Sequence, residues 1–132
     1  MEVIIILYVS DQTKSRLFYH HLLHKEPELD VPGMTEFILG ESCRLGLMPS
    51  NGIASILGNN IIHPEAGNGI PRCELYLRME NIEQEFENSV NIGATVLSPI
   101  IDRDWGDKVF YLADPDGHII AFAAPIRNDV TV

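Results

Sequence analysis

The sequence predicts an α+β protein made of two tandem modules, each with a strand, a helix and about three further strands. Three observations support this order. Strand and helix patterns recur in both halves, turn residues separate the strands, and residues 105–125 spell out a closing hairpin. The recurrence keeps a fixed offset, since Leu7 lies 70 residues before Leu77. Two like modules of this kind share one sheet assembly, with a cleft where they meet.

The first half begins with a run of apolar residues at positions 3–9, which predicts a buried strand. Ser10 and Asp11 offer an N-cap for a helix over residues 11–25, and Pro27 ends this helix. Large apolar side chains at helical spacing predict its core-facing stripe. They are Leu17, Phe18, Leu22 and Leu23.

Further strands complete the first half. A short edge strand is expected at residues 28–31, followed by a Pro-Gly turn. Strands at 34–39 and 43–48 then form a hairpin. Residues 50–70 are rich in Gly and Asn, show few signals of regular structure, and are interpreted as a connector.

The second half repeats the order from a strand at residues 72–79. Asn81 caps the next helix, with Gln84 at the N3 position, and Gly93 ends it before a strand at 94–100. Every fourth residue of this helix is apolar and is expected in the core, whereas three glutamates are expected in water. The apolar residues are Ile82, Phe86 and Val90, and the glutamates are Glu83, Glu85 and Glu87.

The closing hairpin joins strands at 109–113 and 119–123. Its turn, Asp-Pro-Asp-Gly at residues 114–117, combines an Asp that bonds its own backbone, a Pro with preset φ and a Gly for positive φ. The last strand is apolar throughout, so one of its faces is expected in the core and the other in a pocket. We therefore predict a single domain over residues 1–132, with modules at about 1–49 and 71–126.

Composition excludes several classes of function. A net charge of −10, from 19 acidic and 9 basic residues, argues against nucleic-acid binding, which needs a basic surface. No apolar run is long enough to span a membrane, and the apolar start lacks the basic segment and cleavage site of a signal peptide. Cys43 and Cys73 are expected as reduced, buried thiols, so we expect a cytoplasmic protein.

Strand alternation predicts which side chains line the cleft, because the opposite set packs under the helices. The lining residues are Ile4, Ile6 and Tyr8 in the first strand, Glu74, Tyr76 and Arg78 in the corresponding strand of the second half, and Tyr111, Ile119, Ala121 and Ala123 in the closing hairpin. They form an apolar, aromatic surface with one carboxylate and one or two guanidinium groups. Such a surface is typical of a binding pocket for a small molecule.

The chain resembles the vicinal oxygen chelate superfamily, which contains glyoxalase I, bleomycin-resistance proteins and extradiol dioxygenases. The resemblance rests on YVSDQTKSRLFYHHLL at 8–23, ELYLRMENIEQ at 74–84 and WGDKVFYLADPDGHIIAF at 105–122. It implies paired βαβββ modules that form a cupped mixed sheet, usually in a homodimer. It also implies that Trp105 forms a wall of the pocket, the alternative being a rim position in the dimer interface.

Metal-dependent members of that superfamily carry ligands at four places. By position these correspond to Ile4, Glu74, one of residues 45–47, and Ala121. Three of the four are apolar here, and an open divalent-cation site needs about three protein ligands. This departure from the superfamily's ligand pattern predicts no metal cofactor, with a divalent metal bound through Glu74 as the alternative.

Other polar residues are weaker candidates for chemistry. His20 and His24 share a helix face but have no acidic residue between them in HExxH fashion, so we expect solvated side chains. His118 is expected to stabilise the turn before it. His63 in the connector is an alternative acid or base. Three aspartates are expected in a solvated loop, with ion pairs to Arg103 or Lys108 as the alternative; they are Asp102, Asp104 and Asp107.

We therefore expect a metal-free protein of the resistance or sequestration type, which binds a cationic or aromatic small molecule in its cleft. The acidic surface would favour a cationic ligand. One alternative is a glyoxalase-like lyase or isomerase with an atypical metal site at Glu74, completed by His63 or by a residue of the other subunit. Another is catalysis without metal, with Glu74 as general base.

Overall fold

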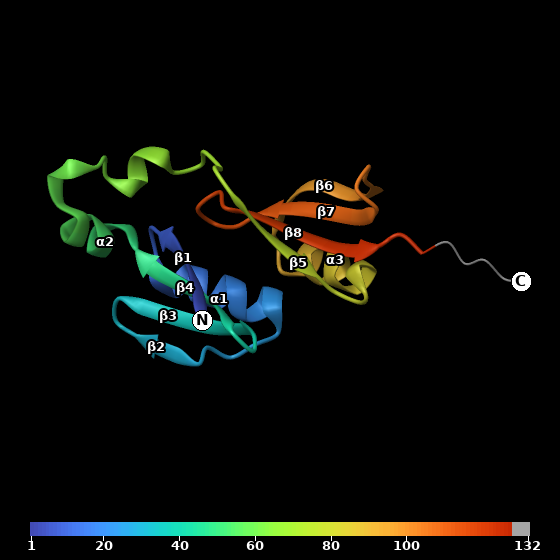
Figure 1. Ribbon diagram of the computed structural model, residues 1–132, viewed down its shortest axis with the longest axis horizontal. Helices are drawn as coiled ribbons and strands as arrows, with labels where there is room; N and C mark the ends of the chain where they lie inside the picture. The colour runs from blue at the N-terminus through green and yellow to red at the C-terminus, as the bar shows by residue number, and fades with distance from the viewer. Residues whose placement is uncertain (128–132) are drawn as a thin grey trace, which may run out of the picture. The chain divides into compact units, whose positions relative to one another are not determined.

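The computed structural model describes residues 1–127, and these residues form two compact units (Figure 1). One unit contains Met1–Pro71 together with Pro115–His118. The other contains Arg72–Asp114 and residues 119–127. Each unit has a four-stranded mixed sheet and the order strand, helix and three strands. The predicted α+β fold of two tandem βαβββ modules is therefore confirmed.

The first unit has its strands in the order β1-β4-β3-β2, with β1 parallel to β4 and the other neighbours antiparallel. The elements are β1 (Val3–Val9), α1 (Gln12–Leu23), β2 (Leu29–Val31), β3 (Met34–Gly40) and β4 (Cys43–Pro49). Asp11 caps α1 because its side-chain oxygen accepts a hydrogen bond of 3.0 Å from the amide of Lys14.

The core of this unit lies between the sheet and α1. Fully buried sheet residues such as Phe37 and Leu47 pack below the helix, which contributes Ser15, Tyr19, Leu22 and Leu23. The prediction of Leu17 in the core was wrong, since 46% of this residue is exposed. A helix turns about 100° per residue, so Leu17 lies roughly 200° around the axis from Ser15 and faces water.

The connector contains regular structure that the sequence did not predict. Helix α2 spans Ser50–Leu57, and the short 3₁₀ helices η1 (Gly58–Asn60) and η2 (Pro64–Gly67) follow it. Interpreting this stretch as irregular was wrong because its Ile, Leu and Ala residues sustain a helix that includes Gly52. Gly58, with φ of +72°, ends α2.

The second unit has its strands in the order β5-β8-β7-β6, with β5 parallel to β8 and the other neighbours antiparallel. The elements are β5 (Glu74–Arg78), α3 (Ile82–Asn91), β6 (Thr95–Asp102), β7 (Asp107–Ala113) and β8 (Ile119–Pro125). As predicted, Asn81 caps α3, and its side-chain oxygen accepts a 3.2 Å hydrogen bond from the Gln84 amide.

Aromatic rings join α3 to the sheet. Phe110 of β7 stacks on Phe122 of β8 with ring centroids 5.1 Å apart, and Phe86 of α3 meets the Phe110 ring edge-on at 5.2 Å. Both sheet rings are fully buried. Because successive strand residues face opposite sides, this packing leaves the other face of the sheet for Tyr76 and Tyr111.

The predicted faces of α3 need one correction. Val90 is 54% exposed, whereas Glu85 is buried, so the buried set is Ile82, Glu85 and Ser89, with Phe86 half-buried beside them. The prediction used a strict four-residue spacing, which drifts about 40° per step around a helix. Spacings of three and four residues must be combined to stay on one face.

The two cysteines are free thiols, as expected. Cys73 is exposed rather than buried, because β5 begins one residue later and Cys73 lies outside the sheet. Among residues 1–127, no helix has both the length and the apolar character needed to cross a membrane.

Candidate functional site

The face of the second sheet opposite α3 brings together most of the predicted site residues. The strand register places Tyr76, Ala121 and Tyr111 side by side on β5, β8 and β7. Ala121 has no exposed surface and belongs to a buried cluster with Val109 and Ala123, against which the two tyrosines pack. The small side chains thus form a floor, and the tyrosine rings form the surface above it.

Asp107 is a buried acceptor at the edge of this aromatic surface. Only 3% of the residue is exposed, and its Oδ2 accepts hydrogen bonds from the Tyr76 hydroxyl at 2.5 Å and from Arg78 Nη2 at 3.1 Å. The prediction that Asp107 lies in a solvated loop was therefore wrong. Alternation along β7 indicates the position of Asp107, because residues two and four apart on a strand share a face, and Asp107 precedes Val109 and Tyr111 by these spacings.

The alternative prediction, that these aspartates form ion pairs with Arg103 or Lys108, was also wrong for Asp107. Lys108 pairs with Glu83, with Nζ and Oε1 2.5 Å apart. The Arg78 side chain neutralises Asp107 instead, with two-thirds of that arginine side chain exposed. Since Asp107 is buried and Arg78 is not, the ion pair fixes the inner end of an otherwise solvated guanidinium group.

Trp105 completes this arrangement from the turn between β6 and β7. Its indole Nε1 donates a 2.9 Å hydrogen bond to the Tyr76 hydroxyl. Gly106, with φ of +95°, gives the turn its left-handed residue. The polar atom of Trp105 is thus bonded within the protein, while 58% of the residue is exposed. An exposed, fixed indole is well suited to stack against a planar ligand.

The hydrogen-bonded chain runs from Trp105 through Tyr76 to Asp107 and sets the protonation of the phenol. Burial raises the pKa of Tyr76 above its ordinary value, and the hydrogen bond that it donates to Asp107 raises this pKa further. The phenol therefore acts as a hydrogen-bond donor to a carboxylate rather than as a base at neutral pH.

Tyr76 is expected to ionise at a higher pH than an ordinary tyrosine. Because the folded chain holds the phenol proton more tightly than the unfolded chain, Tyr76 contributes stability below a pH of about 10. That contribution is lost as the pH rises through the folded-state pKa. The check is an ultraviolet titration of phenolate in the wild type and in Tyr76→Phe. A difference curve with its midpoint at or below the ordinary tyrosine pKa would contradict this prediction.

Glu74 lies at the first position of β5, on the same face as Tyr76, and pairs in register with Ile119. It is exposed, and no side-chain hydrogen bond or ion pair engages it within residues 1–127. Arg78, on the same strand, pairs with Asp107 rather than with Glu74.

The remaining predicted residues lie on β1 in the first unit. Ile4, Ile6 and Tyr8 share one face of this strand, and each is between 37% and 39% exposed. Gly46 lies opposite Ile6 on β4, and a side chain there would come within 3.1 Å of the Ile6 Cγ1 atom. The absence of a side chain at Gly46 therefore leaves room for Ile4 and Ile6 to pack over β4, and these side chains form an apolar surface.

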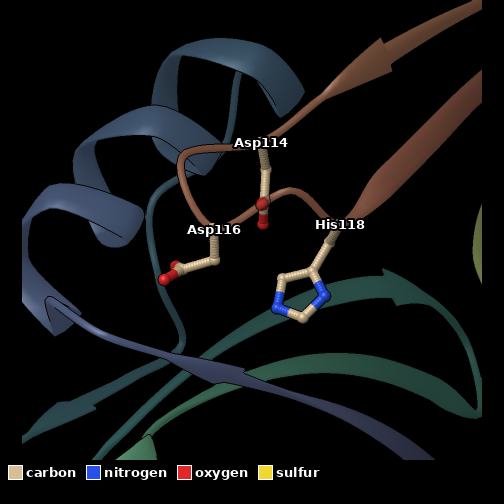
Figure 2. A group of neighbouring side chains, drawn as sticks. All are labelled: Asp114, Asp116 and His118. Atoms are coloured by element: carbon tan, nitrogen blue, oxygen red, sulfur yellow. The ribbon is translucent and has the colours of Figure 1, made fainter. Parts of the chain in front are cut away.

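The turn between β7 and β8 holds a group of possible metal ligands, Asp114, Asp116 and His118, whose ligand atoms lie within 4.8 Å of one another (Figure 2). Asp116 already accepts hydrogen bonds from the Ser10 amide at 2.9 Å and the Ser10 hydroxyl at 2.6 Å. The His118 Nε2 atom lies 2.9 Å from the backbone oxygen of Tyr8. These bonds hold the turn against the start of α1.

The same turn borders a cavity of about 100 Å³ in the first unit. Its lining includes Tyr8, Glu65, Asn68 and His118. Organic ligands generally occupy pockets of about 300–1,000 Å³, so this cavity is too small for one. The aromatic face of the second sheet is the better candidate site.

A comparison of the whole sequence decides the family. Residues 2–127 match the family described as the glyoxalase-like domain. The chain belongs to this family. The uncharacterized proteins Mb0911c of Mycobacterium bovis and Rv0887c of Mycobacterium tuberculosis are each 27% identical to it over 101 residues, 74% of this chain. The chain spans 66% and 59% of the lengths of these relatives.

Solved structures share the fold of this glyoxalase-like domain. A glyoxalase-related enzyme from Fulvimarina pelagi has a TM-score of 0.78 and 22% identity, covering 100% of this chain and 96% of its own. A glyoxalase/bleomycin resistance protein/dioxygenase from Nocardioides has a TM-score of 0.77 and 19% identity, with 100% and 89% covered. TnmS3, an antibiotic-binding protein from Streptomyces sp. CB03234, has a TM-score of 0.71 and 21% identity, with 96% of both chains covered. The resemblance to the vicinal oxygen chelate superfamily is confirmed.

The metal positions of that superfamily do not suit a cation in this glyoxalase-like domain. Ile4 offers no ligand atom, and Ala121 lies buried beneath tyrosine rings in an apolar cluster. Gly46, the middle residue of 45–47, is covered by isoleucine and methionine side chains. Glu74 alone supplies a carboxylate, which is too few protein ligands for an open divalent site.

The structure also accounts for the alternative that His63 completes a site. Its Nδ1 accepts a 3.1 Å hydrogen bond from the Glu65 amide and thereby caps η2. Its Nε2 lies 3.0 Å from the side-chain oxygen of Asn51. Both ring nitrogens are therefore engaged within the connector of this glyoxalase-like domain.

Proposed function

We propose that this glyoxalase-like domain binds an aromatic small molecule without a metal and acts by sequestration. The observation that supports this most is the fixed aromatic surface of the second unit. The exposed Trp105 is tied through Tyr76 to buried Asp107, and Tyr111 lies beside it. The antibiotic-binding protein TnmS3 shares the fold, which is consistent with this proposal.

Binding would use the rigidity of this surface. The indole and the phenol of Tyr76 are each held by a hydrogen bond, so little side-chain entropy is lost when a ring stacks on them. Arg78 and Asp107 neutralise one another and give the surface a polar edge. A sequestering protein needs no bond to be made or broken, and the high pKa of Tyr76 suits a positioning role.

The test uses Trp105, which is the only tryptophan of the chain and reports on its own site. A library of aromatic compounds is screened by thermal shift in the presence of EDTA, and each compound that binds is titrated against Trp105 fluorescence. In calorimetric titrations, which do not need the fluorophore, we expect Trp105→Ala to weaken binding about 30-fold or more, as is usual for a central aromatic contact. Trp105→Phe should retain most of the affinity.

Binding that requires added metal would contradict the proposal. In that case Glu74→Ala separates the alternatives, because a glyoxalase-like lyase or isomerase with an atypical site would lose both metal and turnover. Direct analysis of the metal content of purified protein is the first measurement. Stoichiometric metal that Glu74→Ala removes would favour the enzyme.

We also propose that the protein is a homodimer. The edge strand β1 carries four consecutive exposed apolar residues, Val3, Ile4, Ile5 and Ile6. An edge of this kind invites pairing unless something covers it. Sedimentation equilibrium that gives the mass of one chain would exclude the dimer.

A further inference from the structure

Arg103 is fixed on the aromatic face but lacks a counter-ion. Its Nη2 donates to the Ser98 hydroxyl at 2.8 Å and to the Val109 backbone oxygen at 3.1 Å. The guanidinium carbon lies 5.2 Å from the centre of the Tyr111 ring. Two hydrogen bonds and a cation–π contact thus hold a long, otherwise mobile side chain in one orientation.

The basic side chains within the described strands are each paired with an acid. Arg44 pairs with Glu36, Arg78 with Asp107, and Lys108 with Glu83. Within residues 1–127, Arg103 pairs with no carboxylate, although its backbone amide bonds the Asp107 backbone. Its charge is therefore left uncompensated beside the candidate site.

One nitrogen of this guanidinium also lacks a hydrogen-bond partner. Arg103 Nε is buried and has no hydrogen-bond acceptor among the described residues. A buried donor without an acceptor is costly, and a charged one more so. The two acceptors that bond this cation, the Ser98 hydroxyl and the Val109 carbonyl, are both neutral, so its charge remains available to a ligand.

We propose that Arg103 recognises an anionic group, a carboxylate, on the aromatic ligand that stacks on Trp105. This inference rests on the proposed function, and it names the chemical class of the ligand. Both residues belong to the segment that follows β6, with Arg103 two residues before Trp105. A guanidinium and an exposed indole from one turn suit the two ends of an aromatic acid.

The net charge of −10 does not oppose this assignment at short range. Charges on the surface are screened over about 8 Å at physiological ionic strength, whereas a carboxylate in contact with the guanidinium lies well inside that distance. Arg78 is less suited to this role, because Asp107 already satisfies its charge. Local contacts therefore favour an anionic ligand over the cationic one that the composition suggested.

The test compares three ligands with the same ring: naphthoate, naphthamide and naphthylmethylamine. Calorimetric titration of the wild type is expected to show naphthoate binding at least 10-fold more tightly than naphthamide, with the amine weakest. Raising the salt concentration should reduce the preference for the acid without affecting the amide. Equal affinity for acid and amide would overturn the role of Arg103 and leave the proposed function intact. Failure of all three to bind would contradict the proposed function itself.

Variants locate the preference. Arg103→Gln should remove the difference between acid and amide while leaving the affinity for naphthamide within about twofold. Arg103→Lys, which keeps the charge, should retain part of the difference. Arg16→Gln makes the same charge change in the first unit, where Arg16 faces Asp30, and should preserve the full difference. If Arg103→Gln keeps the preference for naphthoate over naphthamide, the inference is overturned. If that variant does not fold, the salt dependence of this preference in the wild type tests the inference instead.

Discussion

Asp116→Ala is expected to destabilise the protein by about 3 kcal/mol, because the Asp116 carboxylate holds the last turn against the start of α1. One oxygen accepts from the Ser10 amide and hydroxyl, and the other lies 3.4 Å from the buried Ser15 hydroxyl. Removing the carboxylate leaves these donors without their acceptor in a largely dry place. A hydrogen bond to a charged group contributes about 1.5–3 kcal/mol to stability. The loss of several such bonds therefore costs more than the loss of one ordinary hydrogen bond.

Urea denaturation of the two proteins checks this result. Asp116→Asn should cost less, since the amide oxygen still accepts while its nitrogen opposes the serine donors. Asp104→Ala, which removes an exposed aspartate from the β6–β7 turn, is the matched control and should change stability by less than about 0.5 kcal/mol. A cost below about 1 kcal/mol for Asp116→Ala would show that the turn is held by something else. EDTA should not shift the wild-type midpoint; a clear shift would indicate an ion in the group of Figure 2.

Phe110→Ala is expected to cost about 3–5 kcal/mol, the range found for truncating a large aromatic residue in a core. Phe110 is fully buried and joins the sheet to α3, since its ring stacks on Phe122 and receives the edge of Phe86. The loss combines buried area with two ring contacts, each worth about 0.5–1.5 kcal/mol beyond area. The neighbours cannot close such a cavity without moving α3.

Chemical denaturation with a double-mutant cycle measures this effect. The coupling between Phe110→Ala and Phe86→Ala should be about 1 kcal/mol, because their rings touch. Phe18→Ala in α1 is the control, since Phe18 contacts Tyr19 in the first unit and should not couple to Phe110. A cost for Phe110→Ala below about 1.5 kcal/mol would contradict the description of this core.

Local chemistry made much of the fold predictable. The Asp-Pro-Asp-Gly turn and the caps of α1 and α3 are each specified by a few adjacent residues, and the structure confirms them. Strand faces on β5, β7 and β8 followed from alternation alone. Predictions failed where a residue's environment is set by distant packing. Glu85 is buried and Val90 exposed because the sheet, not the spacing of apolar residues, decides which side of α3 is covered.

The candidate site shows the same division. Tyr76, Arg78, Tyr111 and Trp105 were found from alternation and resemblance, and the structure places all four in the second unit. Alternation along β7 places Asp107 on the face of Val109 and Tyr111, but its partner Tyr76 lies 31 residues earlier, and that contact follows only from the folded sheet. The contact of Arg103 with Tyr111 was also missed, because it forms only when β6 pairs with β7.

The membership of Pro115–His118 in the first unit has a consequence for synthesis on the ribosome. Ser10 and Asp116 are 106 residues apart, so the bonds that finish the first unit form only after nearly the whole described chain has emerged. A nascent chain that ends at the connector has β1 to β4 and α1, but it lacks the carboxylate that accepts hydrogen bonds from Ser10 and Ser15. The first unit therefore completes its fold only after the last hairpin has been synthesised.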